Sequence, residues 1–163
     1  LARLSHRGIA QLFDGGIDDA GVPYLALEYV DGRPLTVAAD ERRLGLGERL
    51  VLFAKVCEAV HYAHQQGTLH RDLKPSNILI DRQGRVRITD FGLAKRIEGQ
   101  SDLTLTGQIL GTPSYMPPEQ ARGRRVDHRA DVYSVGAILY EAVTGKRPFL
   151  GDDPMATLAA IAR

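Results

Sequence analysis

Four polar side chains in one part of the chain have suitable types for metal-assisted chemistry on a phosphate compound. The stretch His70-Arg71-Asp72-Leu73-Lys74-Pro75-Ser76-Asn77 supplies a carboxylate, an ammonium and an amide, and Asp90 adds a second carboxylate. A carboxylate can accept the proton of an attacking hydroxyl. Mg²⁺ binds one or two carboxylates and completes its shell with water and phosphate oxygens. The stretch therefore indicates a site where a proton acceptor and a cation act together.

The segments around these residues predict a β-hairpin. Ile78-Leu79-Ile80 and Val86-Arg87-Ile88-Thr89 are short runs rich in aliphatic and β-branched residues, and Asp81-Arg82-Gln83-Gly84 between them is typical of a turn. Strand pairing would place Asn77 and Asp90 on the same rim of the hairpin. Two oxygen-bearing side chains on one rim could hold Mg²⁺.

The spacing matches the protein-kinase signature H-R-D-L-x-x-x-N followed by D-F-G, which falls here at Asp90-Phe91-Gly92. The chain resembles a eukaryotic-like (Hanks-type) serine/threonine protein kinase of the bacterial kind. The resemblance implies an α+β, protein-kinase-like fold with a mostly helical C-terminal lobe. It covers the whole chain but only the middle of the family's domain, so we expect an internal fragment truncated at both ends. Residues 1–30 would form the end of the N-terminal lobe and the hinge, and residues 31–163 the core of the C-terminal lobe.

The resemblance also assigns roles to the polar residues and implies ATP and Mg²⁺ as cofactors, with Mn²⁺ as a substitute. Asp72 would accept the proton of the substrate hydroxyl, and Lys74 would contact the moving phosphoryl group. Asn77 and Asp90 would hold the metal ions. Lys74, two residues after the acid, matches the serine/threonine branch of the family, which makes protein substrates the expected partners.

A nucleotide-binding hinge is implied near the end of a second predicted strand, Val22 to Glu28. Leu27 would be the gatekeeper, the backbone of Glu28 and Val30 would bind the adenine edge, and Leu79 would also line the nucleotide site. The alternative for this segment is an edge strand that ends in an Asp-Gly turn. An earlier strand is predicted from Ile9 to Phe13, ended by Gly15 and Gly16.

The segment from Gly92 to Glu119 has weak periodicity and many Thr, Ser and Gly residues. A long irregular segment within a compact domain is often functional. The resemblance makes it an activation segment that ends in Pro-Pro-Glu, where the family has Ala-Pro-Glu. Thr112 would then tie the substrate-binding loop to the catalytic residues. Glu119 would pair with an arginine from a later helix that these 163 residues do not contain.

Control by phosphorylation is also implied, because Arg71 directly precedes the catalytic acid. A phosphate on the activation segment could pair with an arginine and order the loop. We therefore predict Thr104 or Thr106 as regulatory sites, with Ser101 behind them. The alternative is that all three are solvated loop residues.

Two long amphipathic helices are predicted from apolar side chains at helical spacing. The first runs from Leu46 to Gln66, with Leu50, Phe53, Ala54, Cys57, Val60, His61 and His64 on its buried face. Cys57 is thus expected to pack in the core. His61 and His64 lack a carboxylate or cysteine that would complete a zinc site, so both are expected to be packed or partly exposed. The second helix runs from Asp127 to Thr144, with Val132, Val135, Gly136, Leu139 and Val143 on its buried face. A third helix begins after Asp153.

Asp131 lies among the apolar residues of the second helix, where a buried carboxylate is costly unless it accepts hydrogen bonds. The resemblance implies that it binds the backbone of the catalytic loop near His70 and Arg71, and that His70 and Phe91 pack as internal supports. The alternative is an exposed acid in the first helical turn, favoured by the helix dipole.

The composition limits the classes of function that remain. The 163 residues carry a formal net charge of +1, which gives no general electrostatic case for nucleic-acid or membrane binding. One cysteine excludes an internal disulfide and suits a reducing compartment. No apolar run in the sequence is long enough to span a membrane. We expect a cytoplasmic location, with any membrane anchor of the parent protein outside this chain.

The predicted function is transfer of the ATP γ-phosphate to serine or threonine hydroxyls of proteins by the full-length parent, with a homodimer for trans-phosphorylation as a further expectation. The family's Gly-rich loop, strand lysine and helix glutamate are absent from these residues. The isolated chain is therefore expected to be inactive. The alternatives are a pseudokinase or an inert fragment that acts only as a binding or scaffold module. A small-molecule phosphotransferase is disfavoured by the Thr-rich segment that ends in Pro-Glu.

Overall fold

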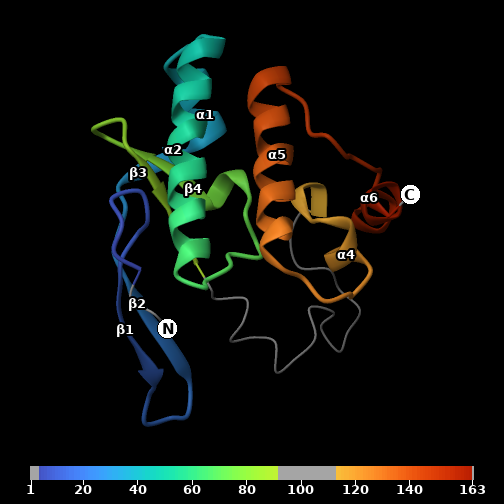
Figure 1. The fold of residues 1–163 in the computed structure, drawn as a ribbon. Coiled ribbons are helices and arrows are strands. Elements are labelled where there is room, and N and C mark those ends of the chain that lie inside the picture. The colour runs from blue at the N-terminus through green and yellow to red at the C-terminus, as the bar shows by residue number, and fades with distance from the viewer. Residues whose placement is uncertain (1–3, 92–112, 163) are drawn as a thin grey trace.

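The computed structural model describes residues 4–91 and 113–162, which form the small sheets and helices of an α+β fold (Figure 1). The predicted residues Gly92, Ser101, Thr104, Thr106 and Thr112 lie outside the described residues. The strands are β1 (Leu12–Ile17), β2 (Pro23–Leu27), β3 (Gly32–Pro34), β4 (Ile78–Asp81) and β5 (Val86–Ile88). The helices are α1 (Leu35–Glu41), α2 (Leu46–Gln65), α4 (Pro118–Ala121), α5 (His128–Thr144) and α6 (Pro154–Ile161), with 3₁₀ turns η1 (Pro75–Asn77) and η2 (Pro113–Tyr115).

The strands form two separate antiparallel sheets. β1 pairs with β2, and the second sheet has the order β3-β4-β5. In Figure 1 the β1–β2 hairpin extends away from the helical part of the molecule. The predicted hairpin is present in β4 and β5, and Gly84 in its turn has a φ of 80°, a conformation that glycine adopts without strain. The predicted boundary between residues 1–30 and 31–163 stays a prediction.

The core lies between the β4–β5 hairpin and the two long helices. Phe53, Val56 and Ala59 of α2 share one buried cluster with Ile78 and Ile88 of the hairpin. α5 runs beside α2 and adds apolar residues to the same cluster (Figure 1). The hairpin that carries the polar residues of interest is thus held against a packed helical support.

The first strand begins and ends later than predicted. β1 runs from Leu12 to Ile17 and passes through Gly15 and Gly16, which were expected to end it. Tyr24 on β2 lies over Gly16, where an added Cβ would come within 3.1 Å of the ring. Small residues thus allow the cross-strand packing here. Ile9 makes only an isolated parallel bridge to Ile88 of β5.

Both long helices form where predicted, but their buried faces differ from the expected ones. In α2, Leu50, Ala54, Cys57 and His61 are exposed, so the prediction that Cys57 packs in the core is wrong. In α5, Val132, Gly136 and Val143 are exposed. The buried residues of the two helices are Phe53, Val56, Ala59, Val60 and Ala63, and Ala130, Asp131, Ser134, Ala137, Ile138 and Ala142. Alanines and polar residues occupy these faces because close packing and hydrogen bonding, rather than side-chain size, decide which residues point inward.

The helix ends follow their local sequence. Asp127 caps α5 by accepting a hydrogen bond from the Arg129 amide, and Gly145 ends it with a left-handed φ of 71°. Asp153 caps α6 in the same way through the amide of Ala156, which confirms the predicted third helix. Neither α1 nor β3 was predicted.

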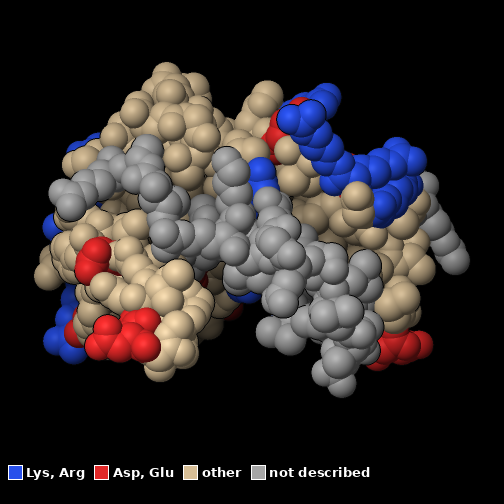
Figure 2. All heavy atoms as spheres, turned by 90° about the horizontal axis from the view of Figure 1, so that it is seen from below, with Lys and Arg blue, Asp and Glu red and all other residues tan. Residues whose placement is uncertain are grey.

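The surface has a local excess of cationic side chains on the side of α4 and α6, seen in Figure 2. The loop between α4 and α5 and the start of α5 contribute exposed arginines at Arg122, Arg124, Arg125 and Arg129. Arg129 is paired with Asp127 at 2.8 Å. Among the residues that the structure describes, no helix is both long and apolar enough to cross a membrane.

Candidate active site

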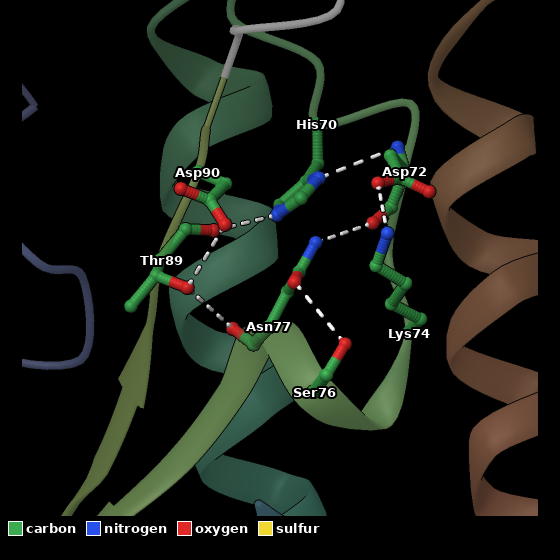
Figure 3. Close-up of polar contacts among 7 residues, drawn as sticks. All are labelled: His70, Asp72, Lys74, Ser76, Asn77, Thr89 and Asp90. Atoms are coloured by element: carbon green, nitrogen blue, oxygen red, sulfur yellow. Dashed lines mark hydrogen bonds and ion pairs between the residues drawn. The ribbon is translucent and has the colours of Figure 1, made fainter. Parts of the chain in front are cut away.

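The β4–β5 hairpin brings the two predicted metal ligands to one rim. The Thr89 amide donates a hydrogen bond to the Asn77 carbonyl at 2.9 Å, which continues the strand pairing beyond Ile78 and Ile88. Asp90 follows directly, and Figure 3 shows its side chain on the same rim as that of Asn77. The Thr89 hydroxyl lies 3.5 Å from both the Asn77 carbonyl and the Asp90 carboxylate.

Asn77 is oriented by the catalytic loop. Its side-chain Nδ2 donates to the Asp72 carbonyl at 2.9 Å, so its Oδ1 points to the other side. The Ser76 hydroxyl contacts this oxygen at 3.4 Å. An amide oxygen beside a carboxylate suits Mg²⁺. Within residues 4–91 and 113–162, no group of three or more His, Cys, Asp or Glu residues could hold a metal. A metal at Asn77 and Asp90 would thus need further ligands from a nucleotide and from water.

Asp72 and Lys74 form an ion pair, with 2.6 Å between the Lys74 Nζ and the Asp72 Oδ2 (Figure 3). The Asp72 side chain is 59% exposed and that of Lys74 is 34% exposed. The carboxylate can therefore be reached by a hydroxyl from solution. The nearby ammonium offers positive charge at the same place, as transfer of an anionic group requires.

His70 connects this loop to the hairpin rim. Its side chain is fully buried, its Nε2 lies 2.8 Å from the Thr89 carbonyl, and its Nδ1 accepts the Asp72 amide at 3.3 Å. Burial lowers the pKa of His70, which keeps the imidazole neutral with its proton on Nε2. Phe91 packs against the ring, with centroids 4.7 Å apart. A neutral imidazole thus fixes the backbone of Asp72 relative to the strand that leads to Asp90.

Asp131 holds the start of the catalytic loop from α5. Its carboxylate is 1% exposed and accepts the amides of His70 at 2.9 Å and Arg71 at 2.8 Å. This is the contact that the family resemblance implied for it. Arg71 has a φ of 68°, a strained conformation for a residue with a side chain. The two amides point at one carboxylate, and Asp131 stabilises that strained turn.

The sequence pattern did not reveal a third partner of this carboxylate. His64 of α2 lies with its Nε2 2.7 Å from the Asp131 Oδ2. His64 was expected only to be packed or partly exposed. Its position on the helix gave no signal of this contact, because Asp131 is 67 residues away along the chain.

The predicted hinge begins where β2 ends. The Glu28 amide donates to the Gln11 carbonyl at 2.8 Å. In the described part of the chain, neither the Glu28 carbonyl nor the Val30 amide takes part in a hydrogen bond. The Glu28 carboxylate forms an ion pair with Arg87 of β5, a contact that the sequence did not predict. Leu27 and Leu79 are half-buried.

The segment before α5 is also held by contacts that were not predicted. The Ser134 hydroxyl donates to the Tyr115 carbonyl at 2.8 Å, and the Tyr115 hydroxyl donates to the Glu141 carboxylate. Burial, followed by that hydrogen bond, raises the pKa of Tyr115. Glu119 is half-buried in the first turn of α4 and lies near enough to raise the pKa of the Tyr133 hydroxyl, after the larger effect of burial.

Comparison with known proteins shows to which family a chain with this site belongs. The family model described as the protein kinase domain matches residues 1–163. The chain belongs to the protein kinase family. The kinase chain is 40% identical over 158 residues to the serine/threonine-protein kinase PknB of Mycobacterium leprae, covering 94% of this chain and 25% of that protein. It is 42% identical over 161 residues to a probable serine/threonine-protein kinase, SCO3848, of Streptomyces coelicolor, covering 95% of this chain and 24% of that protein.

A third relative is the probable serine/threonine-protein kinase PknB of Corynebacterium glutamicum, which is 42% identical over 159 residues, covering 94% of this chain and 25% of that protein. The kinase chain therefore spans about a quarter of the length of the curated relatives that it matches. The predictions of a bacterial Hanks-type kinase and of its fold class are confirmed. Protein kinases as a family use ATP and a divalent metal.

Proposed function

We propose that the full-length protein transfers the γ-phosphate of ATP to serine or threonine hydroxyls of protein substrates. The observation that carries this proposal is the geometry from His70 to Asp90. Asp72 presents an accessible carboxylate, Lys74 lies 2.6 Å from it, and Asn77 and Asp90 share one rim. Phosphoryl transfer needs alignment and charge neutralisation more than covalent chemistry, and these side chains are suited to both.

Each residue has a defined part in this mechanism. Asp72 orients the substrate hydroxyl and accepts its proton, while Lys74 places positive charge beside the transferring group. Asn77 and Asp90 would hold Mg²⁺, or Mn²⁺ in its place, and the metal would neutralise charge on the nucleotide phosphates. Leu27, Leu79 and the backbone of Glu28 and Val30 would bind the adenine. Within the described residues, the Glu28 carbonyl and the Val30 amide make no hydrogen bond. Both groups can therefore bind the adenine edge, which supports that assignment.

Regulation, partners and location follow from the same proposal. Ser101, Thr104 and Thr106 are proposed phosphosites, which a second copy of the kinase would modify in a homodimer. Thr112 and Glu119 would position the activation segment. We propose a cytoplasmic site of action, because the reaction consumes ATP. A pseudokinase or scaffold function is not favoured, since Asp72, Lys74, Asn77 and Asp90 are all present.

The test compares two substitutions in the full-length protein. Asp72→Asn keeps the shape of the side chain but removes the proton acceptor, so we expect kcat to fall by about 10²-fold or more. Asp90→Asn weakens metal binding, so its activity should partly return as Mg²⁺ is raised, whereas that of Asp72→Asn should not. The measurement is incorporation of labelled phosphate into a protein substrate at saturating ATP. Full activity of both variants would contradict the proposed roles.

A further inference from the structure

Two exposed arginines between α4 and α5 have no part in the proposed mechanism. Among the described residues, the side chains of Arg124 and Arg125 take part in no ion pair and no hydrogen bond. The neighbouring arginines are engaged. Arg129 pairs with Asp127 at 2.8 Å, and Arg122 donates to a backbone carbonyl at the end of α6. Arg124 and Arg125 therefore present two cationic side chains to a partner.

This segment concentrates positive charge in a chain that is nearly neutral. Residues 122–129 contain four arginines and one aspartate, a formal charge of +3, whereas the whole chain carries +1. The remaining residues are therefore net negative. Figure 2 shows cationic side chains gathered on the side of α4 and α6. An anionic partner is drawn to this side of the molecule and disfavoured elsewhere.

The backbone between α4 and α5 is fixed at both ends. The Gly123 amide donates to the Gln120 carbonyl at 2.9 Å, and the Arg124 amide donates to the Glu119 carbonyl at 2.8 Å. With Gly123 at a left-handed φ of 63°, these bonds form the Schellman arrangement that ends a helix. Asp127 then caps the start of α5. Because the loop is held in place before a partner arrives, binding costs little ordering of its backbone.

Arg125 also lines a cavity of about 930 Å³ that is open to solvent. Asp127 lines it too, but its carboxylate is paired with Arg129. Other side chains of the wall include His61, His64, Gln65, Leu69 and His128. Imidazole and amide groups can donate hydrogen bonds to the oxygens of an anion, and a cavity of this size can hold part of a peptide.

The cavity lies close to the proposed catalytic acid. Leu69 lines the cavity and Asp72 follows it by three residues. Since neighbouring Cα atoms are about 3.8 Å apart, the Cα atoms of these two residues are separated by at most about 11 Å. One protein substrate could therefore contact both places.

We propose that Arg124, Arg125 and this cavity form a docking site for an acidic segment of a protein substrate. Guanidinium groups bind carboxylates and phosphate groups through paired hydrogen bonds, so the segment carries aspartate, glutamate or phosphorylated side chains. A membrane fits less well, because anionic lipids are recognised by clusters of about four to eight cationic residues. The inference rests on the proposed function, because it names a class of substrate for the same kinase.

The test measures binding and catalysis separately in the full-length protein. Three fluorescent peptides share one serine acceptor and differ in a neighbouring run of glutamates, phosphoserines or glutamines. The variants are Arg125→Gln, the double variant Arg124→Gln/Arg125→Gln, and Arg43→Gln as the matched control. Arg43 is also exposed and makes no side-chain contact of this kind among the described residues, but it lies at the opposite end of α2 from the cavity (Figure 1).

We expect the wild type to bind the glutamate and phosphoserine peptides more tightly than the glutamine peptide. Arg125→Gln should weaken binding of both acidic peptides by about 3-fold and the double variant by about 10-fold, as for exposed ion pairs. Arg43→Gln should bind like the wild type. The KM for the glutamate peptide should rise in the double variant by a similar factor. Added salt should weaken binding more in the wild type than in the double variant.

Equal affinity of the wild type for the glutamate and glutamine peptides would overturn the inference, and so would an equal loss in Arg43→Gln. Binding to phosphatidylserine vesicles without a preference among the peptides would assign the arginines to a membrane surface and also overturn it. Tighter binding of the phosphoserine peptide would identify a previously phosphorylated substrate, and tighter binding of the glutamate peptide an acidic sequence. Both results support the site.

Peptide binding does not depend on catalysis. A wild type that binds the acidic peptides but transfers no phosphate would contradict the proposed function and leave the docking site supported. An active wild type without a preference for acidic peptides would do the reverse.

Discussion

The catalytic hairpin and the two long helices behind it are specified by different kinds of residue. Between His70 and Asp90 the side chains of the kinase motif have proposed roles in the chemistry, and the spacing of the motif predicts where they lie. In α2 and α5 the residues that face inward are often alanines or polar residues, and large apolar residues such as Val132 and Val143 face outward. A short motif is thus a better guide to position here than hydrophobic periodicity.

The difference has a physical reason. α2 and α5 pack closely against the loop and the hairpin, so small side chains are needed where backbones approach. A Cβ added to Gly8 would lie 3.1 Å from the Cβ of Ala59, which shows how little room remains on that face of α2. Asp131 and Ser134 face inward because they bind backbone groups of other segments. The buried helix faces thus hold the loop as well as forming part of the apolar core.

The largest expected effect comes from removing the carboxylate that joins the two regions. Asp131→Asn would point an NH₂ group toward groups that are themselves hydrogen-bond donors. At least one backbone amide would then lack an acceptor, and each buried group without a partner costs about 1–3 kcal/mol of stability. We expect a lower free energy of unfolding in urea and a loss of kinase activity. The control is Asp127→Asn at the start of the same helix, since Asn caps helices about as well as Asp. Equal stability of the two variants would show that the loop does not depend on α5.

A second prediction tests which face of α2 is buried. Ala59→Leu should destabilise the protein by about 1–3 kcal/mol, the usual cost of overpacking a filled core, because Ala59 is fully buried. Ala54→Leu makes the same change on the same helix at a residue expected to be buried but found exposed. It should alter the free energy of unfolding by no more than about 0.5 kcal/mol. Thermal and urea unfolding of both variants measure the contrast, and the reverse order would favour the face that periodicity predicts.

The sequence was sufficient for the parts of the fold that local chemistry determines. The hairpin and the rim shared by Asn77 and Asp90 follow from turn residues and from motif spacing, and the spans of the two long helices follow from the spacing of apolar residues. The contacts His64–Asp131 and Glu28–Arg87 could not be predicted, because each joins residues about 60 positions apart that no local pattern relates. Strand β1 was misplaced because Gly15 and Gly16 allow close packing there instead of ending the strand.

A smaller effect is expected from protonation of His70, whose imidazole is buried in the catalytic loop. Since burial lowers the pKa of His70, the unfolded chain binds a proton first as the pH falls below its ordinary value of 6.5. Stability contributed by the neutral ring is therefore complete above that pH and declines as the pH falls toward the lower pKa of the folded state. His70→Gln keeps a donor for the Thr89 carbonyl but does not titrate. The difference in unfolding free energy between wild type and His70→Gln should stay constant above about pH 6.5 and fall as the pH drops below that value, and a constant difference over the whole range would contradict a neutral buried ring.

The smallest expected effect concerns Cys57, which periodicity placed in the core and the structure places on the surface of α2. Cys57→Ser should change the free energy of unfolding by no more than about 0.5 kcal/mol, as for most surface positions. The native protein should also react fully with a maleimide. Partial burial raises the pKa of this thiol, so the labelling rate should keep rising with pH above neutrality, because the thiolate is the reactive form. If labelling occurred only in the presence of denaturant, Cys57 would be buried. That result would support the helix face that periodicity predicts.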